Sequence, residues 1–278
     1  MNKAGAGLNR EEVSFILMTT TLQTLPEILI HIDAGVMTLT LNRVDKKNSI
    51  TAVMYGAMAD ALEAANHDPA VRVVVIQGHE SIFSAGNDIG DFLKNPPSTQ
   101  DSPVFCFLRG ISSFPKPLVA AVCGPAVGIG TTMLLHCDLV YAGDNAAFSL
   151  PFVNLGLCPE AASSFLVPQL MGYPRAAEAL LLGEPFMAET ALEIGLINRI
   201  VPPTEANALA QRQALKLAAK PFSSLLETKR LMKKGNAGIV AERIAEEGAS
   251  FGRMLQEPAA REAFTAFMEK RRPDFSKV

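Results

Sequence analysis

Two glycine-bearing loops have the residue types and spacing from which a catalytic pocket can be built. One spans residues 83–89 (FSAGNDI) and the other spans residues 123–130 (CGPAVGIG). Each follows a buried apolar strand and leads into a helix, and the first N–H groups of a helix have no partner within it. We therefore expect the backbone N–H groups of Asn87 and Ile129 to point at one oxygen atom that gains negative charge during a reaction. Such an arrangement is an oxyanion hole.

The glycines in these loops allow a ligand to approach the backbone closely. Gly86, Gly128 and Gly130 have no Cβ atom, and the helix expected near Thr131 adds partial positive charge at the Ile129 N–H. The hole suits a thioester, because the enolate oxygen of a thioester carries the charge once an α-proton has been removed. The same glycines also fit two ordinary strand-to-helix turns, and both interpretations stay open on the pattern alone.

An oxyanion hole needs a proton acceptor, and Glu160 is the best candidate. It follows Pro159 where we expect a helix to begin, and the helix dipole would favour the ionised carboxylate there. Its apolar neighbours, which include Phe152 and Phe165, could instead remove it from water and raise its proton affinity, as a useful base requires. The sequence does not decide between these influences, and a solvent-exposed glutamate in a first helical turn is the alternative interpretation.

The elements that must position these residues alternate between strand and helix. Residues 27–32 and 36–41 predict a hairpin around residues 33–35, and Ser49 or Thr51 is placed to cap a helix over 51–66. Asp88 and Asp91 are expected to cap the helix after the first loop. The remaining expected strands are 71–76, 118–122, 139–142 and 197–201; the remaining expected helices are 103–113, 131–136, 161–171, 175–182, 189–194, 205–219, 223–233, 239–255 and 259–270.

The composition predicts one large globular domain with a helical appendage. The chain has 278 residues, of which 49% are hydrophobic and 19% are charged, and no apolar run reaches the length of about 20 residues that a membrane span needs. The net charge of −3 gives no general attraction to a nucleic-acid backbone. Four cysteines without CxxC spacing and four histidines without metal-like pairing predict neither a disulfide nor a metal site. We therefore predict a cytoplasmic protein that binds neither nucleic acid nor membrane.

Several motifs occur in the order found in one family. They are FSAGND at residues 83–88, GPAVGIG at 124–130, CDLVYA at 137–142, LNR at 41–43, KNS at 47–49, ALEIGLI at 191–197 and FMEKRRPDF at 267–275. With these motifs the chain resembles the enoyl-CoA hydratase/isomerase (crotonase) superfamily over residues 26–275. The resemblance is specific at the level of the superfamily, because several motifs occur together and in order.

The resemblance implies an α/β fold and an acyl-CoA substrate. The first residues lack the apolar core of a secretory signal and predict a flexible leader over residues 1–25. The resemblance implies a crotonase spiral of ββα units over 26–200, and a C-terminal helical region over 201–278 that builds a homotrimer or a dimer of trimers. Coenzyme A would enter only as part of the substrate, with no permanently bound cofactor. The thioester oxygen would be held by the N–H groups of Asn87 and Ile129. Contacts to the substrate and its CoA would come from Lys47, Asn48, Ala85, Gly86, Asp88, Ile89, Gly128 and Lys270.

The departures from the family pattern narrow the implied reaction. Hydratases of this superfamily carry two glutamates, and the matching positions here are Thr132 and Phe152, neither of which can activate water. The context of Glu160 is similar to the Δ3,Δ2-enoyl-CoA isomerase branch, which implies that Glu160 takes a proton from C2 of a 3-enoyl-CoA and returns it at C4. Two alternatives remain: a hydratase or another crotonase reaction, and a catalytically silent acyl-CoA binder.

Overall fold

The computed structural model describes residues 25–97, 99 and 101–278, so nearly all of the leader predicted over 1–25 lies outside the described residues. The strands are β1 (Ile28–Asp33), β2 (Val36–Leu41), β3 (Val73–Gln77), β4 (Leu118–Val122), β5 (Pro125–Val127), β6 (Leu139–Gly143), β7 (Ala147–Ser149), β8 (Phe186–Met187) and β9 (Arg199–Val201). The α-helices are α1 (Ala52–His67), α2 (Ile89–Lys94), α3 (Pro103–Ser113), α4 (Ile129–Thr132), α5 (Ser163–Met171), α6 (Tyr173–Ala177), α7 (Ala188–Glu193), α8 (Pro203–Ala218), α9 (Phe222–Lys233), α10 (Ala237–Met254) and α11 (Pro258–Met268). The shorter helical turns are η1 (Val44–Lys46), η2 (Met133–His136), η3 (Val153–Leu155), η4 (Glu178–Leu182, a π-helical turn) and η5 (Phe275–Lys277).

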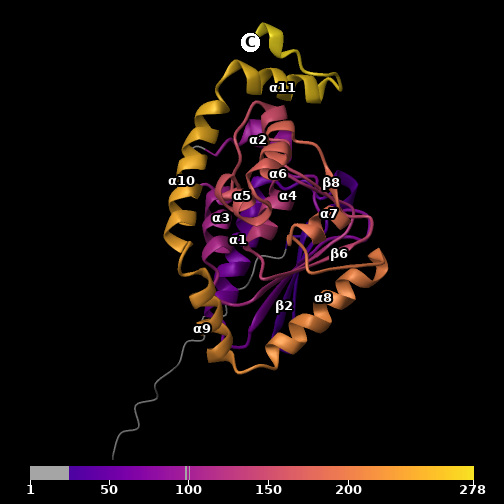
Figure 1. Ribbon diagram of the computed structural model, residues 1–278, viewed down its shortest axis with the longest axis vertical. Coiled ribbons are helices and arrows are strands. Elements are labelled where there is room, and N and C mark those ends of the chain that lie inside the picture. The colour runs from indigo at the N-terminus through magenta and orange to yellow at the C-terminus, as the bar shows by residue number, and fades with distance from the viewer. Residues whose placement is uncertain (1–24, 98, 100) are drawn as a thin grey trace, which may run out of the picture.

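The larger sheet has the strand order β1-β2-β3-β4-β6-β9. Its first pair is the predicted antiparallel hairpin, and the other neighbours are parallel. Helices cover both faces of this sheet: α8 packs on β3, β4 and β6, and Figure 1 shows α1 and α3 on the opposite side of the strands. Strands buried on both faces need continuous apolar runs, which is why β3 and β4 consist almost entirely of valine, alanine, leucine and isoleucine.

The alternation of side chains along β3 divides the interior into two layers. Val73 and Val75 pack in the layer beneath α8, whereas Val74 and Ile76 pack in the larger layer toward α1 and α3. Successive residues of a strand point to opposite faces, so one strand supplies both layers. The rigid sheet that results fixes where the loops at the ends of β3 and β4 begin.

Three short strands form a second sheet that the sequence pattern did not predict. Its order is β5-β7-β8, with β5 parallel to β7 and β7 antiparallel to β8. The second glycine loop therefore includes a strand, β5, before α4 begins at Ile129 rather than at residue 131. This sheet fixes the backbone that leads to the Ile129 N–H.

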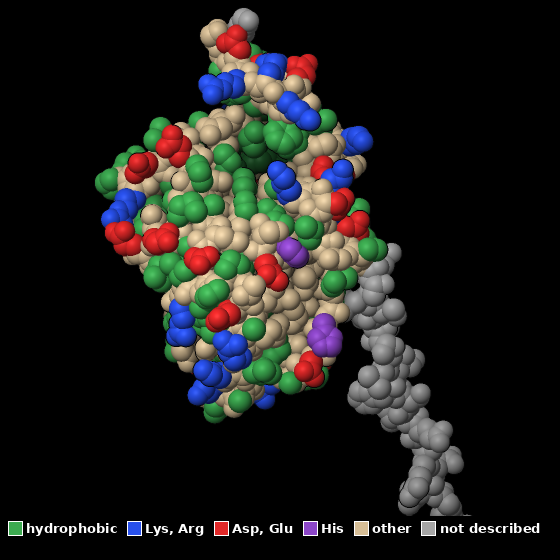
Figure 2. Space-filling view, turned by 90° about the vertical axis from the view of Figure 1, so that its right-hand side faces the viewer, with side chains coloured by type: hydrophobic (Ala, Val, Ile, Leu, Met, Phe, Trp, Pro, Cys, Tyr) green, Lys and Arg blue, Asp and Glu red, His purple; other side chains and the backbone are tan. Residues whose placement is uncertain are grey.

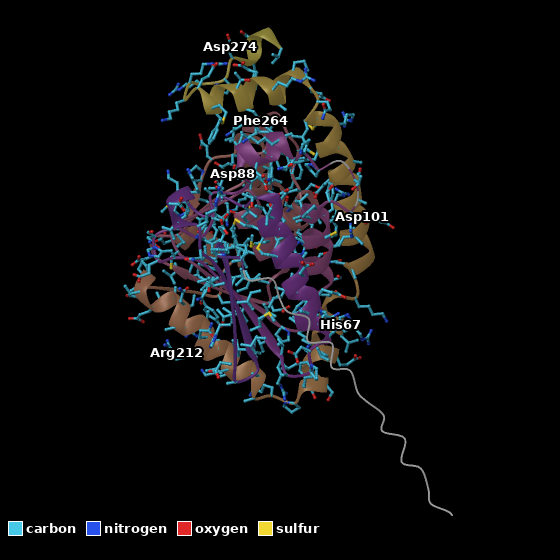
Figure 3. All side chains as sticks on the ribbon, turned by 180° about the vertical axis from the view of Figure 1, so that it is seen from behind. His67, Asp88, Asp101, Arg212, Phe264 and Asp274 are labelled. Carbon is cyan, nitrogen blue, oxygen red and sulfur yellow. The ribbon has the colours of Figure 1, made fainter. Side chains whose placement is uncertain are left out.

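The C-terminal helices wrap around the core. Figure 1 shows α10 along one side of the molecule and α11 across one end, and α10 packs against both α3 and α5. Figure 3 places Asp88 and Phe264 near that end, whereas His67 and Arg212 lie toward the other. No helix within the described ranges is long and apolar enough to cross a membrane. The role of this region in building an oligomer stays a prediction.

Candidate active site

The two glycine loops lie side by side and are joined by backbone hydrogen bonds. The Ser84 N–H donates to the carbonyl oxygen of Pro125 at 3.1 Å, and the Val127 N–H donates to the carbonyl oxygen of Ser84 at 2.9 Å. Gly86 has a φ of +88°, and a Cβ atom at this position would lie 2.9 Å from the Val127 oxygen. Only glycine fits here without displacing one loop from the other.

The N–H groups of Asn87 and Ile129 are free to bind a ligand. Within the part of the chain that the structure describes, neither amide donates a hydrogen bond, although the amides of Gly86, Asp88 and Gly128 all do. Ile129 is the first residue of α4, so its amide also lies at the positive end of a short helix. Asn87 and Ile129 both line one cavity, and this placement is the one that an oxyanion hole requires.

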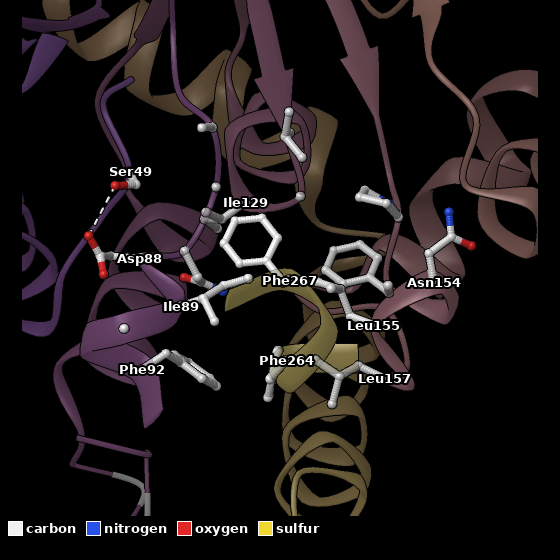
Figure 4. A pocket seen from close by; sticks show the side chains of 18 of the residues that line it. Ser49, Asp88, Ile89, Phe92, Ile129, Asn154, Leu155, Leu157, Phe264 and Phe267 are labelled. Carbon is white, nitrogen blue, oxygen red and sulfur yellow. Dashed lines mark hydrogen bonds between the residues drawn. The ribbon is translucent and has the colours of Figure 1, made fainter. Parts of the chain in front are cut away.

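This cavity has a volume of about 500 Å³, and its lining is mostly apolar with a few polar and charged side chains. Figure 2 shows a hollow with hydrophobic side chains beneath the C-terminal lobe, and Figure 4 shows Phe264, Phe267 and Leu157 pointing into it. The apolar lining comes from Phe92, Val127, Phe152, Leu155, Leu157, Phe251, Phe264, Phe267 and Met268. Lys46, Lys47 and Ser49 supply polar atoms from the η1 region. The cavity therefore fits a ligand with an apolar chain and an anionic part.

Most of the predicted ligand-contacting residues line this cavity. Those that do are Lys47, Ala85, Gly86, Asn87, Asp88, Ile89, Gly128 and Ile129. Asn48 and Lys270 do not. Asn48 is fully buried, and its side-chain amide donates to the carbonyl oxygens of Ile82 and Phe83, so it holds the first loop in place. Lys270 is exposed just beyond α11, and its predicted contact with a CoA phosphate stays a prediction.

Asp88 acts as a helix cap at the cavity wall. One carboxylate oxygen accepts the Asp91 N–H at 2.9 Å, as the sequence predicted, and the other lies 2.6 Å from Arg43 Nη1 and 3.2 Å from Ser49 Oγ (Figure 4). Partial burial opposes ionisation of Asp88, but the hydrogen bonds from Arg43, Asp91 and Ser49 outweigh it and lower the pKa. Asp88 is therefore an ionised structural group, with its oxygens committed to α2 and to Arg43.

Glu160 lies in a loop, which corrects the expectation that it begins a helix. The helix α5 begins only at Ser163, because Ala161 and Ala162 adopt left-handed backbone conformations with φ of +60° and +58°. The residue is only 7% exposed, and its Oε1 has no hydrogen-bond partner among the described residues. Burial, with a smaller contribution from the carboxylate of Glu247, raises the pKa of Glu160 to about 8. Desolvation is therefore the main influence on this carboxyl group.

A pair of aromatic rings stands between Glu160 and the main cavity. Glu160 lines a small adjoining hollow of about 10 Å³, and Phe92 and Phe251 line both this hollow and the main cavity. Their rings meet edge to face with centroids 6.0 Å apart. Everything else that lines the hollow around Glu160 is apolar or small, namely Pro97, Val104, Phe105, Leu108, Ala161, Ile244 and Gly248. The Phe92 and Phe251 rings are therefore shared walls of the main cavity and of the hollow around Glu160.

Sequence reasoning missed two polar residues close to this constellation. Tyr55 is buried on α1, and its hydroxyl donates to Asn87 Oδ1 at 2.5 Å. Burial, and then the nearby Glu160, raises the pKa of Tyr55 well above its usual value, so the hydroxyl remains a neutral donor. Glu247 on α10 accepts two hydrogen bonds from the loop that follows Glu160. The available sequence signal for Tyr55 and Glu247 was that each is a polar residue on the apolar face of a predicted helix.

The positions matched to the two hydratase glutamates hold no acidic side chain in this site. Thr132 and Phe152, the positions matched to the two hydratase glutamates, are buried and carry no carboxylate, and Phe152 lines the main cavity. In the described ranges, no group of three or more His, Cys, Asp or Glu side chains could hold a metal ion. The described constellation can stabilise an enolate oxygen and offers Glu160 as the base.

Comparisons with known proteins show the family of this chain. A family model described as enoyl-CoA hydratase/isomerase matches residues 31–277. The chain is 37% identical over 213 residues to enoyl-CoA delta isomerase 2 of Rattus norvegicus, which covers 74% of this chain and 54% of that protein. It is 32% identical over 259 residues to 1,2-epoxyphenylacetyl-CoA isomerase of Escherichia coli, with 90% of this chain and 98% of that protein covered. The chain thus spans about half the length of the first relative and nearly all of the second.

The fold is also found among solved structures. The structure of Pseudomonas aeruginosa OdaA superposes with a TM-score of 0.85 at 47% identity, and the match covers 87% of this chain and 98% of that one. The α/β crotonase fold predicted from the motifs is therefore confirmed. Because the family model matches nearly the whole described chain, the protein belongs to the enoyl-CoA hydratase/isomerase (crotonase) family, whose members act on acyl-CoA substrates.

Proposed function

We propose that the protein is a Δ3,Δ2-enoyl-CoA isomerase in which Glu160 moves one proton between two carbons. The ionised carboxylate removes a proton from C2 of a 3-enoyl-CoA, and the electron pair passes into a dienolate whose oxygen carries the negative charge. The carboxyl group then returns the same proton to C4, which leaves the double bond at C2 and regenerates the carboxylate. The proton transfer consumes no water and needs no second acid.

The burial of Glu160 carries the proposal. A carboxyl group with an unpartnered oxygen in an apolar hollow, and with a pKa of about 8, is a much stronger base than an exposed glutamate. Thr132 and Phe152 supply no second carboxylate for the activation of water. A single base suffices for a shuttle between carbons, whereas hydration calls for groups that activate water and protonate carbon.

The oxyanion hole supplies the second half of the proposed mechanism. The free N–H groups of Asn87 and Ile129 would hold the thioester oxygen as charge builds on it, and removal of one such donor typically costs about 10²–10³ in rate. The 37% identity to a delta isomerase supports the same reaction. An apolar acyl chain suits the phenylalanine-lined part of the cavity, and Lys46 and Lys47 suit the phosphates of CoA.

Assembly and location form part of the proposal. Leu231 and Met232 on α9 are 55% and 78% exposed, and large exposed apolar side chains support burial against another copy in a homotrimer or a dimer of trimers. Coenzyme A would enter and leave with the substrate rather than remain bound. The cytoplasmic location stays a prediction.

A panel of 3-enoyl-CoA thioesters of increasing chain length tests the proposed reaction. We expect conversion to the 2-enoyl products, and a 3-enoyl-CoA that carries deuterium at C2 should give a product that carries part of this deuterium at C4. Rapid hydration of crotonyl-CoA with 3-hexenoyl-CoA left unchanged would instead identify a hydratase. Binding of thioesters without any C2 proton exchange would identify a silent acyl-CoA binder.

A further inference from the structure

The helix α10 forms one wall of the hollow around Glu160. Ile244, Gly248 and Phe251 line this hollow, and their spacing places them on one face of the helix. Glu247 lies next to Gly248 on the same helix and is only 5% exposed. A carboxylate buried to this extent needs hydrogen-bond donors, and its donors come from the loop that carries Glu160.

The carboxylate of Glu247 holds the turn that follows Glu160. Its Oε2 accepts the Ala162 N–H at 2.6 Å, and its Oε1 accepts the Ser164 N–H at 2.9 Å. These are amides at the start of α5 that have no partner within the helix. One turn earlier on α10, Arg243 Nη1 donates to Ser164 Oγ at 3.2 Å. Two charged side chains of α10 therefore fasten the segment that begins at Glu160.

We propose that Glu247 is a positioning residue for the reaction: its carboxylate fixes the turn that carries Glu160, and its negative charge acts on the Glu160 carboxyl group. The consequence for catalysis rests on the proposed function, but the structural and electrostatic effects do not. The C-terminal helical region would then complete the active site of its own subunit, in addition to any role in assembly.

The two carboxyl groups have different surroundings, which decides where the proton resides. Burial raises the pKa of Glu247, but the Ser164 and Ala162 donors and the nearby Arg243 oppose this rise. Glu160 has no such donors, so burial first and Glu247 second raise its pKa to about 8. Both carboxyls are buried, but only Glu247 has hydrogen-bond donors, and these favour its ionised form, so a proton shared by the pair resides on Glu160.

The other titratable groups that face Glu160 are neutral near pH 7. Burial raises the pKa of Tyr55 on α1 and raises the pKa of Cys158 in the loop to about 11. His136 on η2 contacts the Ala161 carbonyl through Nε2, and burial, followed by the charge of Lys233, lowers its pKa to about 4. Glu247 is therefore the charged neighbour whose removal is expected to change the titration of Glu160.

The test compares Glu247→Gln with Glu242→Gln. Both variants remove one negative charge from α10, but Glu242 is exposed and does not line the hollow, so it is the matched control. The probe is the carboxyl ¹³C resonance of Glu160, which is identified as the signal absent from Glu160→Gln. We expect its titration midpoint to move to lower pH in Glu247→Gln and to stay in place in Glu242→Gln.

The pH dependence of kcat/KM and the value of kcat give a second, independent test of the role of Glu247. Each unit by which the midpoint falls should raise kcat/KM at pH 6, relative to its plateau, by about tenfold. Glu247→Asp keeps the charge but shortens the side chain, so the midpoint should stay near that of the wild type while kcat falls by about 10- to 100-fold through misplacement of Glu160. This variant decides the positioning role even if Glu247→Gln fails to fold.

Two results would overturn the inference. One is a Glu160 midpoint that is the same in folded Glu247→Gln as in the wild type, and the other is a wild-type kcat in Glu247→Asp. Failure of the proposed function is distinguishable from both, because a wild-type protein that isomerises no 3-enoyl-CoA still yields the ¹³C titration. If the midpoint shifts in Glu247→Gln of such a protein, the electrostatic role of Glu247 is supported and only the proposed isomerase reaction is wrong.

Discussion

Replacement of Glu160 by glutamine is expected to stabilise the protein at alkaline pH. Burial, and to a lesser degree Glu247, raises the pKa of this carboxyl group from 4.5 to about 8 in the folded chain. Between these values the folded state holds a proton that the unfolded state has released. The stability associated with this group is therefore fully present below pH 4.5 and is lost as the pH rises toward 8.

The magnitude follows from the difference between the two pKa values. The difference between 4.5 and about 8 is about 3.5 units, and each unit corresponds to about 1.4 kcal/mol, which gives roughly 5 kcal/mol as an upper value. Glutamine has a similar shape and does not titrate. The free energy of unfolding of Glu160→Gln minus that of the wild type should therefore grow by about 1.4 kcal/mol for each pH unit between pH 5 and pH 8.

Urea unfolding at pH 5, 6, 7 and 8, at one protein concentration, measures this difference. Any cost of burying the glutamine amide is the same at each pH, so the slope isolates the titration of Glu160. Glu242→Gln provides the control for removal of an exposed charge and should show a small, nearly constant difference. A difference between Glu160→Gln and wild type that is the same at pH 5 and pH 8 would refute the assignment of Glu160 as a desolvated base.

Three further predictions concern the site. Because the proposed base must be ionised, kcat/KM should rise about tenfold from pH 6 to pH 7 and level off above pH 8; a flat profile over this range would contradict the raised pKa of Glu160. Gly86→Ala should lower kcat by about 10²-fold, because a Cβ atom 2.9 Å from the Val127 oxygen displaces the Asn87 amide; wild-type kcat in a correctly folded variant would exclude that amide from the hole. Tyr55→Phe leaves Asn87 Oδ1 without its donor and should lower the free energy of unfolding by about 1–3 kcal/mol in urea titrations, whereas an unchanged value would show that the bond contributes nothing.

Local patterns predicted the large elements well, because each of them has a strong periodic or continuous apolar signal. The helix α3 and the strand β4 have the bounds expected from the sequence. Thr51 and Asp88 cap their helices as predicted, through hydrogen bonds to Met54 N and Asp91 N. The strands β5, β7 and β8 have only two or three residues each, which is too short for any period to appear.

The surroundings of Glu160 could not be predicted, because they depend on contacts that are distant in the sequence. Ala161 and Ala162 are good helix formers, yet both are held in left-handed conformations beside a carboxylate 85 residues away from Ala162. The choice between the helix dipole and desolvation was open because it depends on Phe251 and Ile244, which reach Glu160 only through the packing of α10. Asn48 was predicted to contact the ligand, but its side chain is used to hold the first glycine loop.

The turnover of Glu160→Gln on a 3-enoyl-CoA tests the central claim most directly. With the binding of a saturated acyl-CoA measured in parallel, we expect binding close to that of the wild type and isomerisation lowered by about 10²–10⁴-fold, the usual contribution of a positioned acid–base group. Isomerisation by this variant at a rate near that of the wild type would contradict the claim that Glu160 carries the proton.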